Sequence, residues 1–195
     1  MVSVNNEKGR TLGEADGFIA SAKAKLEREI LNIEKRDDLT DDQKVNQIIV
    51  VFSSLCAGVA VQPIPFADFF ILTPIQAYMG TRISAIRGMP LSEKEVRVVV
   101  TEIAGVVGLG FFAQQLAIGA YKTVLPFLAG FTTIPLVFGM SYGIGKVMDT
   151  YFVNRAKGVR LSPDEIKKAW AHARAEGNKK GKEKASEIKK DAKRQ

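Results

Sequence analysis

The middle of the chain alternates apolar stretches with prolines. Residues 45–67 and 123–145 carry no charged side chain, and each is interrupted by a pair of prolines, the first pair being Pro63 and Pro65. Because proline disrupts the interior of a helix, each stretch predicts an apolar helix, a proline turn and a returning apolar helix. The first uninterrupted helix is shorter than the roughly 20 residues that span a bilayer, so the pattern leaves open whether the hairpins cross a membrane or rest on it.

Polar residues dominate both ends of the chain. From 14 to 36, apolar side chains recur every three or four residues, as on one face of a helix, while Lys and Glu occupy the other face. The apolar positions are Ile19, Ala22, Leu26, Ile30 and Ile33. From 163 onward the chain is polar and basic, and we expect a helix there that breaks at Gly177.

Capping boxes, in which Ser or Thr is followed three residues later by Glu or Gln, mark four helix starts. They begin at Thr40, Thr73, Ser92 and Ser162. The predicted helices run from 41 to about 61, from 74 to about 87, from 93 toward Tyr121 and from 163 onward. A short helical piece is expected at 66–72, and one more helix from Thr133 to about Arg155. No strand periodicity is present, so the predicted fold class is all-α: apolar helical hairpins with proline turns, flanked by an amphipathic N-terminal helix and a basic C-terminal one.

Composition divides the chain into a polar segment 1–44, a hydrophobic helical domain 45–155 and a basic tail 156–195. Residues 155–195 hold fourteen basic and six acidic side chains, a net charge of +8 in a chain whose total is +7. A basic tail beside an apolar domain suits an anionic membrane surface or a nucleic acid. The stretch 179–194 has no aromatic residue to stack on bases, so we expect a solvated helix, with a membrane-surface contact as the first alternative and a nucleic-acid contact as the second. The candidate membrane-surface residues are Trp170, Lys179, Lys180, Lys182 and Lys184.

Small residues at four-residue spacing suggest close helix packing in the second apolar stretch. Gly139 and Gly143 form one such pair, and Ser141 and Gly145 form another. This spacing lets two helix backbones approach closely. We expect a contact within the chain, with a contact between copies of a homo-oligomer as the alternative.

The residues offer little catalytic chemistry. Cys56 is the only cysteine and His172 the only histidine, and they lie far apart in the sequence. The run from Gly143 to Lys146 lacks the glycine spacing and the closing Ser or Thr of a phosphate-binding loop. We therefore expect no enzymatic activity, no cofactor and no metal site.

The first proline turn carries a motif. Its residues are Pro63, Pro65, Phe66 and Asp68, followed by Thr73, Pro74 and Gln76. Asp68 is the sole acid between Val45 and Glu93. It is expected to cap a helix or to meet backbone amides freed by the prolines, and the functional alternative is a polar contact at the hairpin tip.

This motif, together with the later stretch 125–145, resembles the YcjF-type hydrophobic domain of unknown function, which is associated with Era-like and dynamin-like GTPases. The resemblance covers residues 45–155. It implies an all-helical domain at the bacterial inner membrane that works with a GTPase. We see no GTPase motif in this sequence, which leaves such a partner either to act in trans or to be absent.

The sequence thus supports three hypotheses. The first is a non-enzymatic, membrane-associated helical protein with cytoplasmic termini that anchors or recruits a partner. No secretory signal is expected, since the first apolar run begins near Val45. The alternatives are a soluble, cytoplasmic protein-interaction module and a homo-oligomeric pore or transport component lined by Asp68.

Overall fold

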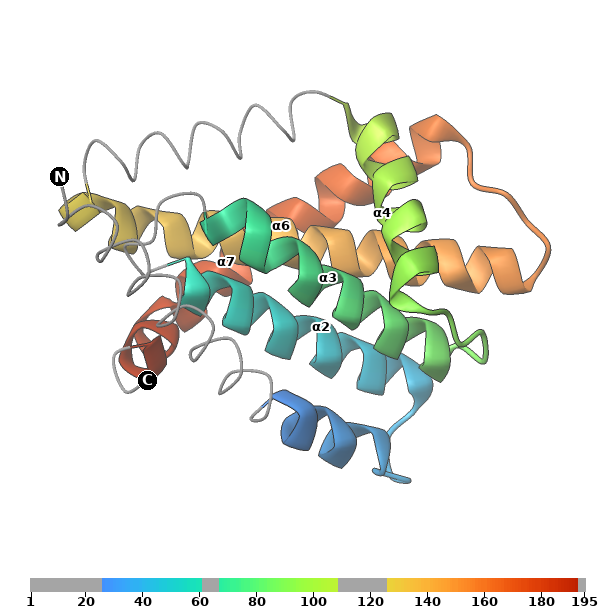
Figure 1. The fold of residues 1–195 in the computed structure, drawn as a ribbon, viewed down its shortest axis with the longest axis horizontal. Helices are drawn as coiled ribbons and strands as arrows, with labels where there is room; N and C mark the ends of the chain where they lie inside the picture. The colour runs from blue at the N-terminus through green and yellow to red at the C-terminus, as the bar shows by residue number, and fades with distance from the viewer. Residues whose placement is uncertain (1–25, 61–66, 109–125, 193–195) are drawn as a thin grey trace, which may run out of the picture.

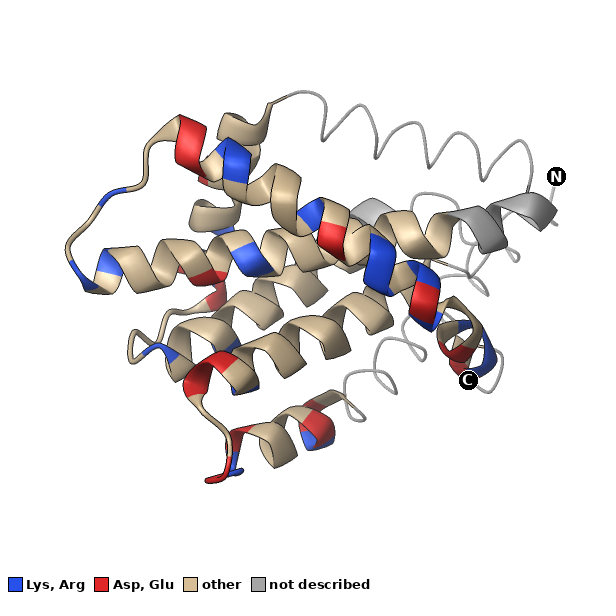
Figure 2. Cartoon of the chain, turned by 180° about the vertical axis from the view of Figure 1, so that it is seen from behind, with Lys and Arg blue, Asp and Glu red and all other residues tan. Residues whose placement is uncertain are grey.

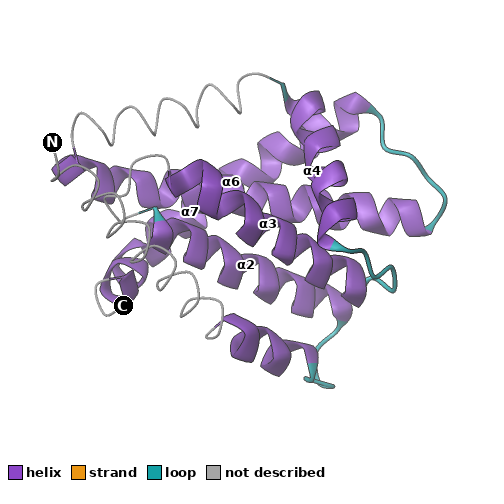
Figure 3. Ribbon diagram, in the orientation of Figure 1, coloured by secondary structure: helices purple, strands orange, loops and turns teal. Residues whose placement is uncertain are grey.

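The computed structural model describes residues 26–60, 67–108 and 126–192 (Figure 1). Every regular element in these ranges is a helix (Figure 3), which confirms the all-α prediction. A helical segment at 26–34 precedes the longer helices. These are α2 (Asp41–Val59), α3 (Ala67–Ile86), α4 (Glu93–Val107), α6 (Pro126–Ala156) and α7 (Pro163–Ala192).

The long helix α6 lies at the centre of the bundle and contacts each of α2, α3, α4 and α7. α2 and α3 lie side by side in front of it in Figure 1, and α7 folds back along its other side. A helix that is apolar around its whole circumference is suited to such a central position. From Thr133 to Asp149, all but three residues of α6 are buried.

One hydrophobic core connects the bundle. Its largest fully buried side chains include Phe52 of α2 together with Phe138 and Phe152 of α6. The same cluster contains Ile30 from the N-terminal helical segment and Trp170 from α7. The core therefore extends over both boundaries that composition suggested, at 44/45 and at 155/156.

Three of the four predicted capping boxes begin helices. In each box, the Glu or Gln side chain accepts a hydrogen bond from the backbone N–H of the capping Ser or Thr. The hydroxyl of that Ser or Thr accepts a hydrogen bond from the backbone N–H of the Glu or Gln. The caps are Thr40 for α2, Ser92 for α4 and Ser162 for α7. Local sequence signals therefore locate these three helix starts.

The predicted helix start at Thr73 is wrong. α3 begins before it and runs through Pro74. Leu72 is buried in a small cluster with Val59 of α2 and Val137 of α6. Such tertiary contacts hold the chain helical across a proline that would break an isolated helix.

Three other predicted boundaries also differ from the structure. α6 runs through Pro135 instead of restarting at Thr133. α7 is continuous through Gly177, because that glycine is packed against α6. α4 ends at Val107, followed by Gly108 with φ 86°, and the remainder of the helix predicted toward Tyr121 falls outside the described residues.

A three-way ion pair joins the start of α2, the residue that follows α3 and the C-terminal part of α6. Arg87 Nε donates to Asp149 Oδ1 at 2.7 Å and its Nη2 donates to Asp149 Oδ2 at 3.1 Å. The same Nη2 lies 2.7 Å from Asp42 Oδ1. The side chains of Arg87 and Asp149 are each only 13% exposed, so this pair is largely shielded from solvent.

Candidate functional site

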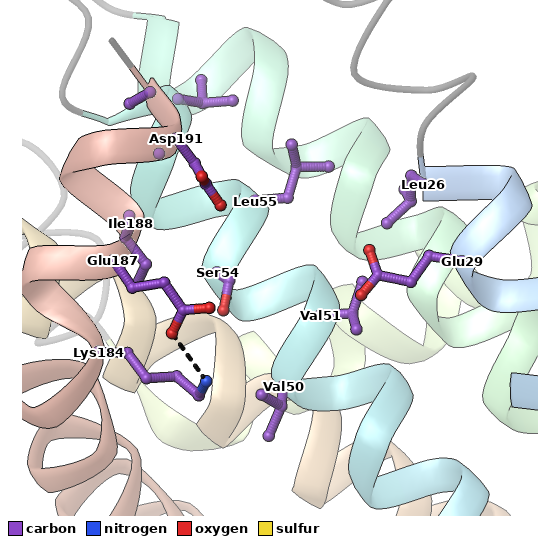
Figure 4. Close-up of a pocket in the computed structure, with 13 residues that line it drawn as sticks. Leu26, Glu29, Val50, Val51, Ser54, Leu55, Lys184, Glu187, Ile188 and Asp191 are labelled. Atoms are coloured by element: carbon purple, nitrogen blue, oxygen red, sulfur yellow. Dashed lines mark hydrogen bonds and ion pairs between the residues drawn. The ribbon is translucent and has the colours of Figure 1, made fainter. Parts of the chain in front are cut away.

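A groove follows the outer face of α2, between the 26–34 helix and the C-terminal half of α7 (Figure 4). Its deeper part is a cavity of about 220 Å³ that reaches from the 26–34 helix across α2 to α7. A shallower hollow between the 26–34 helix and the start of α2 continues it. The two hollows share Glu29, Val50 and Val51, so they form one continuous groove.

The groove is long enough for a short helix. Its lining residues on α2 run from Asn46 to Val59. At 1.5 Å per residue this is about 20 Å, the length of a helix of roughly 13 residues.

The floor of the groove is apolar because α2 carries apolar residues on its outer face as well as on the inner face that packs in the core. The inner face buries Ile48 and Phe52 in the core. Val50, Val51 and Leu55 lie on the outer face, where they are only partly buried and line the groove. An apolar strip of this kind is typical of grooves that accept an amphipathic helix.

The rim of the groove is mainly acidic. Glu29 stands on one side, and Glu187 and Asp191 of α7 stand on the other, all three exposed (Figure 4). The lining holds two basic side chains, and both pair with a carboxylate: Lys184 Nζ lies 3.3 Å from Glu187 Oε2, and Arg36 Nε donates to Asp38 Oδ1 at 2.9 Å. In a chain of net charge +7, this concentration of carboxylates favours a basic occupant.

One wall of the groove is anchored from behind. Glu34, at the end of the 26–34 helix, accepts a bidentate pair from Arg82 of α3, with Nε at 2.7 Å from Oε1. This hydrogen-bonded pairing raises the pKa of the Arg82 guanidinium above its ordinary value. Lys44 Nζ also donates to the Glu34 carbonyl oxygen at 3.0 Å. The wall is therefore tied to both α2 and α3.

The proline-turn motif is only partly described. Pro63, Pro65 and Phe66 lie outside the described residues, and Asp68 lies in the first turn of α3. Thr73 and Pro74 are within α3. Gln76 is 5% exposed, and its Nε2 donates to Ser141 Oγ of α6 at 3.2 Å. This residue of the motif is a buried link between two helices.

The predicted packing glycines lie at two different contacts. Gly139 and Gly143 face α7, where the Trp170 ring and Asn178 lie against them. Gly145 faces Ile49 of α2 and a methionine of α3 instead. α7 contributes its own pair, Gly177 and Gly181, which were not among the predicted packing residues. Their four-residue spacing was the available signal, and it was obscured by the polar residues around it.

The predicted membrane-surface residues separate into different environments. Trp170 is 8% exposed and packs against Gly143, so its assignment to the surface is wrong: the missing side chain of the glycine makes room for the indole. Lys179 and Lys182 are exposed on α7. Lys180 pairs with Glu176 at 3.6 Å, and Lys184 lies on the rim of the groove.

Within the described ranges, no three His, Cys, Asp or Glu side chains converge as a metal site. Cys56 is buried and His172 is exposed on α7. No helix in the described part of the chain is both long and apolar enough to cross a membrane.

The chain has a distant relative among known proteins. Magnetosome membrane protein 22 of Magnetospirillum gryphiswaldense is 25% identical over 135 residues, which cover 67% of this chain and 69% of the relative. No protein-family model matches the chain. No solved structure matches it. The chain is thus distantly similar in sequence to a protein whose name describes it as a membrane protein.

Proposed function

We propose that this chain is a non-enzymatic, membrane-associated helical protein that recruits a partner by binding a basic amphipathic helix in the α2 groove. The observation that carries the recruitment is the apolar strip of Val50, Val51 and Leu55, left partly open beneath an acidic rim. Leucine-type side chains of the partner would lie on this strip, and its lysines or arginines would meet Glu29, Glu187 and Asp191. The sequence resemblance suggests a GTPase acting in trans as the protein that supplies the helix.

Membrane association is supported by two independent observations. The distant relative is named as a membrane protein. The chain also places a net charge of +8 in residues 155–195, which suits the anionic cytoplasmic leaflet. We further propose that the membrane is a bacterial inner membrane.

Membrane association is tested by fractionating cells that express the full chain and washing the membrane pellet with high salt and with alkaline carbonate. Retention through both washes would indicate insertion, and release by salt would indicate attachment through surface charge. Recovery of the protein entirely outside the pellet would contradict membrane association and leave a soluble interaction module.

The groove is tested with a fluorescent synthetic helix of about 13 residues that carries leucines on one face and lysines on the other. Its twin, with glutamates in place of the lysines, controls for charge. We expect anisotropy to report binding of the basic helix alone. Val51→Asp in the groove should abolish that binding, whereas Val98→Asp on the exposed surface of α4 should not. Equal binding of the two helices, or equal binding by the two variants, would contradict the groove assignment.

A further inference from the structure

The loop between α6 and α7 combines exposed cations with an exposed apolar side chain. It lies at one end of the longest axis of the molecule (Figure 1). Residues 155–160 are all exposed, and they include Arg155, Lys157 and Arg160. No acidic residue occurs from 150 to 163. Figure 2 shows basic positions on this loop, at the far end of the molecule from the C-terminus.

Val159 lies between these cations and is 52% exposed. α6 ends in a Schellman motif, in which Gly158 with φ 71° donates to Arg155 O at 3.0 Å and Val159 N donates to Asn154 O at 2.9 Å. The backbone that carries Val159 is therefore held by two hydrogen bonds.

The end of α3 shows what a valine in this position would ordinarily do. The same motif occurs there, with Gly88 at φ 72° and Met89 N donating to Ser84 O at 2.8 Å. The hydrophobic residue after the glycine usually packs back on its helix, and Met89 does pack against the core. Val159 is held at the equivalent position with half of its surface in solvent.

The neighbouring carboxylates compensate only part of this charge. Arg160 is 91% exposed and lies 3.8 Å from Glu102, while Arg155 lies over the Tyr151 ring. Glu165, in the first turn of α7, accepts hydrogen bonds from the backbone and hydroxyl of Ser162. The side chains of Lys157 and Arg160 are exposed on the loop, where their charges can meet an anionic surface.

We propose that the α6–α7 loop, residues 155–161, is the surface that contacts an anionic lipid bilayer. Lys157 and Arg160 meet lipid phosphates, and Val159 enters the boundary between headgroups and acyl chains. The proposal rests on the membrane association proposed above and assigns it to a defined surface. It assigns the contact to the loop instead of the lysines of α7, because α7 carries four acidic residues between 176 and 191 whereas residues 150–163 carry none. Two of those lysines, Lys180 and Lys184, pair with these acids.

The test is co-sedimentation of the full chain with vesicles of phosphatidylcholine, either pure or mixed with phosphatidylglycerol. Each basic residue at an anionic surface contributes roughly fivefold in affinity, so Lys157→Ala with Arg160→Ala should weaken binding to the mixed vesicles about 30-fold. Val159→Ser should weaken it further. Wild-type protein should bind the pure phosphatidylcholine vesicles far less.

Lys179→Ala with Lys182→Ala is the matched control, because it removes the same charge from exposed positions. Lys179 lies about 24 Å along α7 from Pro163, which is beyond the screening length of about 10 Å at moderate salt. This variant should bind the mixed vesicles as the wild type does. Circular dichroism checks that all variants are folded.

Three results would overturn the assignment. If the loop variant binds as the wild type and the α7 variant does not, the contact lies on α7 and membrane association stands. If neither variant changes binding, the loop is excluded while membrane association again stands. If the loop variant binds the mixed vesicles as the wild type does but loses binding to double-stranded DNA in a gel-shift assay, the loop is a nucleic-acid contact. The cell fractionation above judges membrane association separately.

Discussion

Gly139 of α6 and Gly177 of α7 pack backbone to backbone. A Cβ atom at position 177 would lie 2.9 Å from Gly139 Cα and 3.1 Å from its carbonyl oxygen. It would also lie 2.8 Å from Tyr142 Cβ, an atom fixed to the backbone. Since none of these atoms can move without shifting a helix, the α6–α7 contact depends on the absence of a side chain at this position.

Gly177→Ala should therefore lower the free energy of unfolding by about 1–3 kcal/mol, the usual cost of overpacking. Gly105→Ala in α4 is the matched control, because a Cβ there meets nothing within 4 Å. Its better helix propensity should raise stability by up to about 1 kcal/mol. Urea denaturation measures both, and shifts of the same sign would contradict the packing argument.

Arg87→Met should destabilise the protein by about 3 kcal/mol, because it leaves the shielded Asp149 carboxylate without its partner. Adding Asp149→Asn removes the orphaned charge and should recover much of the loss. Arg97→Met breaks an exposed pair with Glu93 at 3.9 Å and should cost less than about 1 kcal/mol. Thermal unfolding compares the three variants; equal losses for Arg87→Met and Arg97→Met would contradict the shielding of the first pair.

Ser141→Ala should cost about 1–3 kcal/mol, since it leaves the buried Gln76 amide without its acceptor. Replacing Gln76 by Leu in the same background removes the unsatisfied group and should restore much of the stability. The measurement is again urea denaturation of the single and double variants. A Ser141→Ala variant as stable as the wild type would mean that the amide finds another partner.

Two capping boxes should make the protein sensitive to acid. Hydrogen bonds from Ser92 and Ser162 lower the pKa values of Glu95 and Glu165 below their ordinary 4.5. The stability that these carboxylates contribute is complete above their unfolded-state pKa, near 4.5, and is lost as the pH falls through the lower folded-state value. Acid should therefore weaken the starts of α4 and α7.

Glu95→Gln with Glu165→Gln keeps the capping geometry and removes the titration, as Gln43 already does in the box that starts α2. This double variant should lose less thermal stability than the wild type between about pH 7 and about pH 3. Glu183→Gln, at an exposed position of α7, serves as the control and should follow the wild type. An unchanged acid response in the double variant would remove these caps from the explanation.

The sequence predicts those features that depend on neighbouring residues. Thr40, Ser92 and Ser162 start helices because capping is a matter of four consecutive residues. The predicted helix start at Pro74 and the predicted interruption at Pro135 are wrong, because packing against other helices carries the helix through both prolines and no local pattern encodes that packing. The predicted exposure of Trp170 failed for the same reason, since Gly143 makes its site from 27 positions away in the chain.

The groove could not be predicted from the sequence, because it too depends on contacts between distant segments of the chain. Val50, Val51 and Leu55 belong to an apolar stretch of the sequence, and that stretch fits a membrane-associated hairpin as well as the core of a soluble helical module. Only the placement of the 26–34 helix and of α7 turns the outer face of α2 into a groove, and the ion pair that fixes one wall joins Arg82 to Glu34 across 48 positions. Hydrophobic periodicity reports on residues within a single helix, so it does not predict contacts between residues so far apart in the sequence.

The position of Trp170 makes the protein its own optical probe. It is the single tryptophan of the chain, and its ring atoms Cζ3 and Cε3 would lie 2.9 and 3.1 Å from a Cβ at position 143. If a partner or a bilayer lifts α7 from α6, the indole enters water and its emission shifts to the red, while the helical circular dichroism persists. Opening of the hairpin can thus be followed in solution without a label and separately from unfolding.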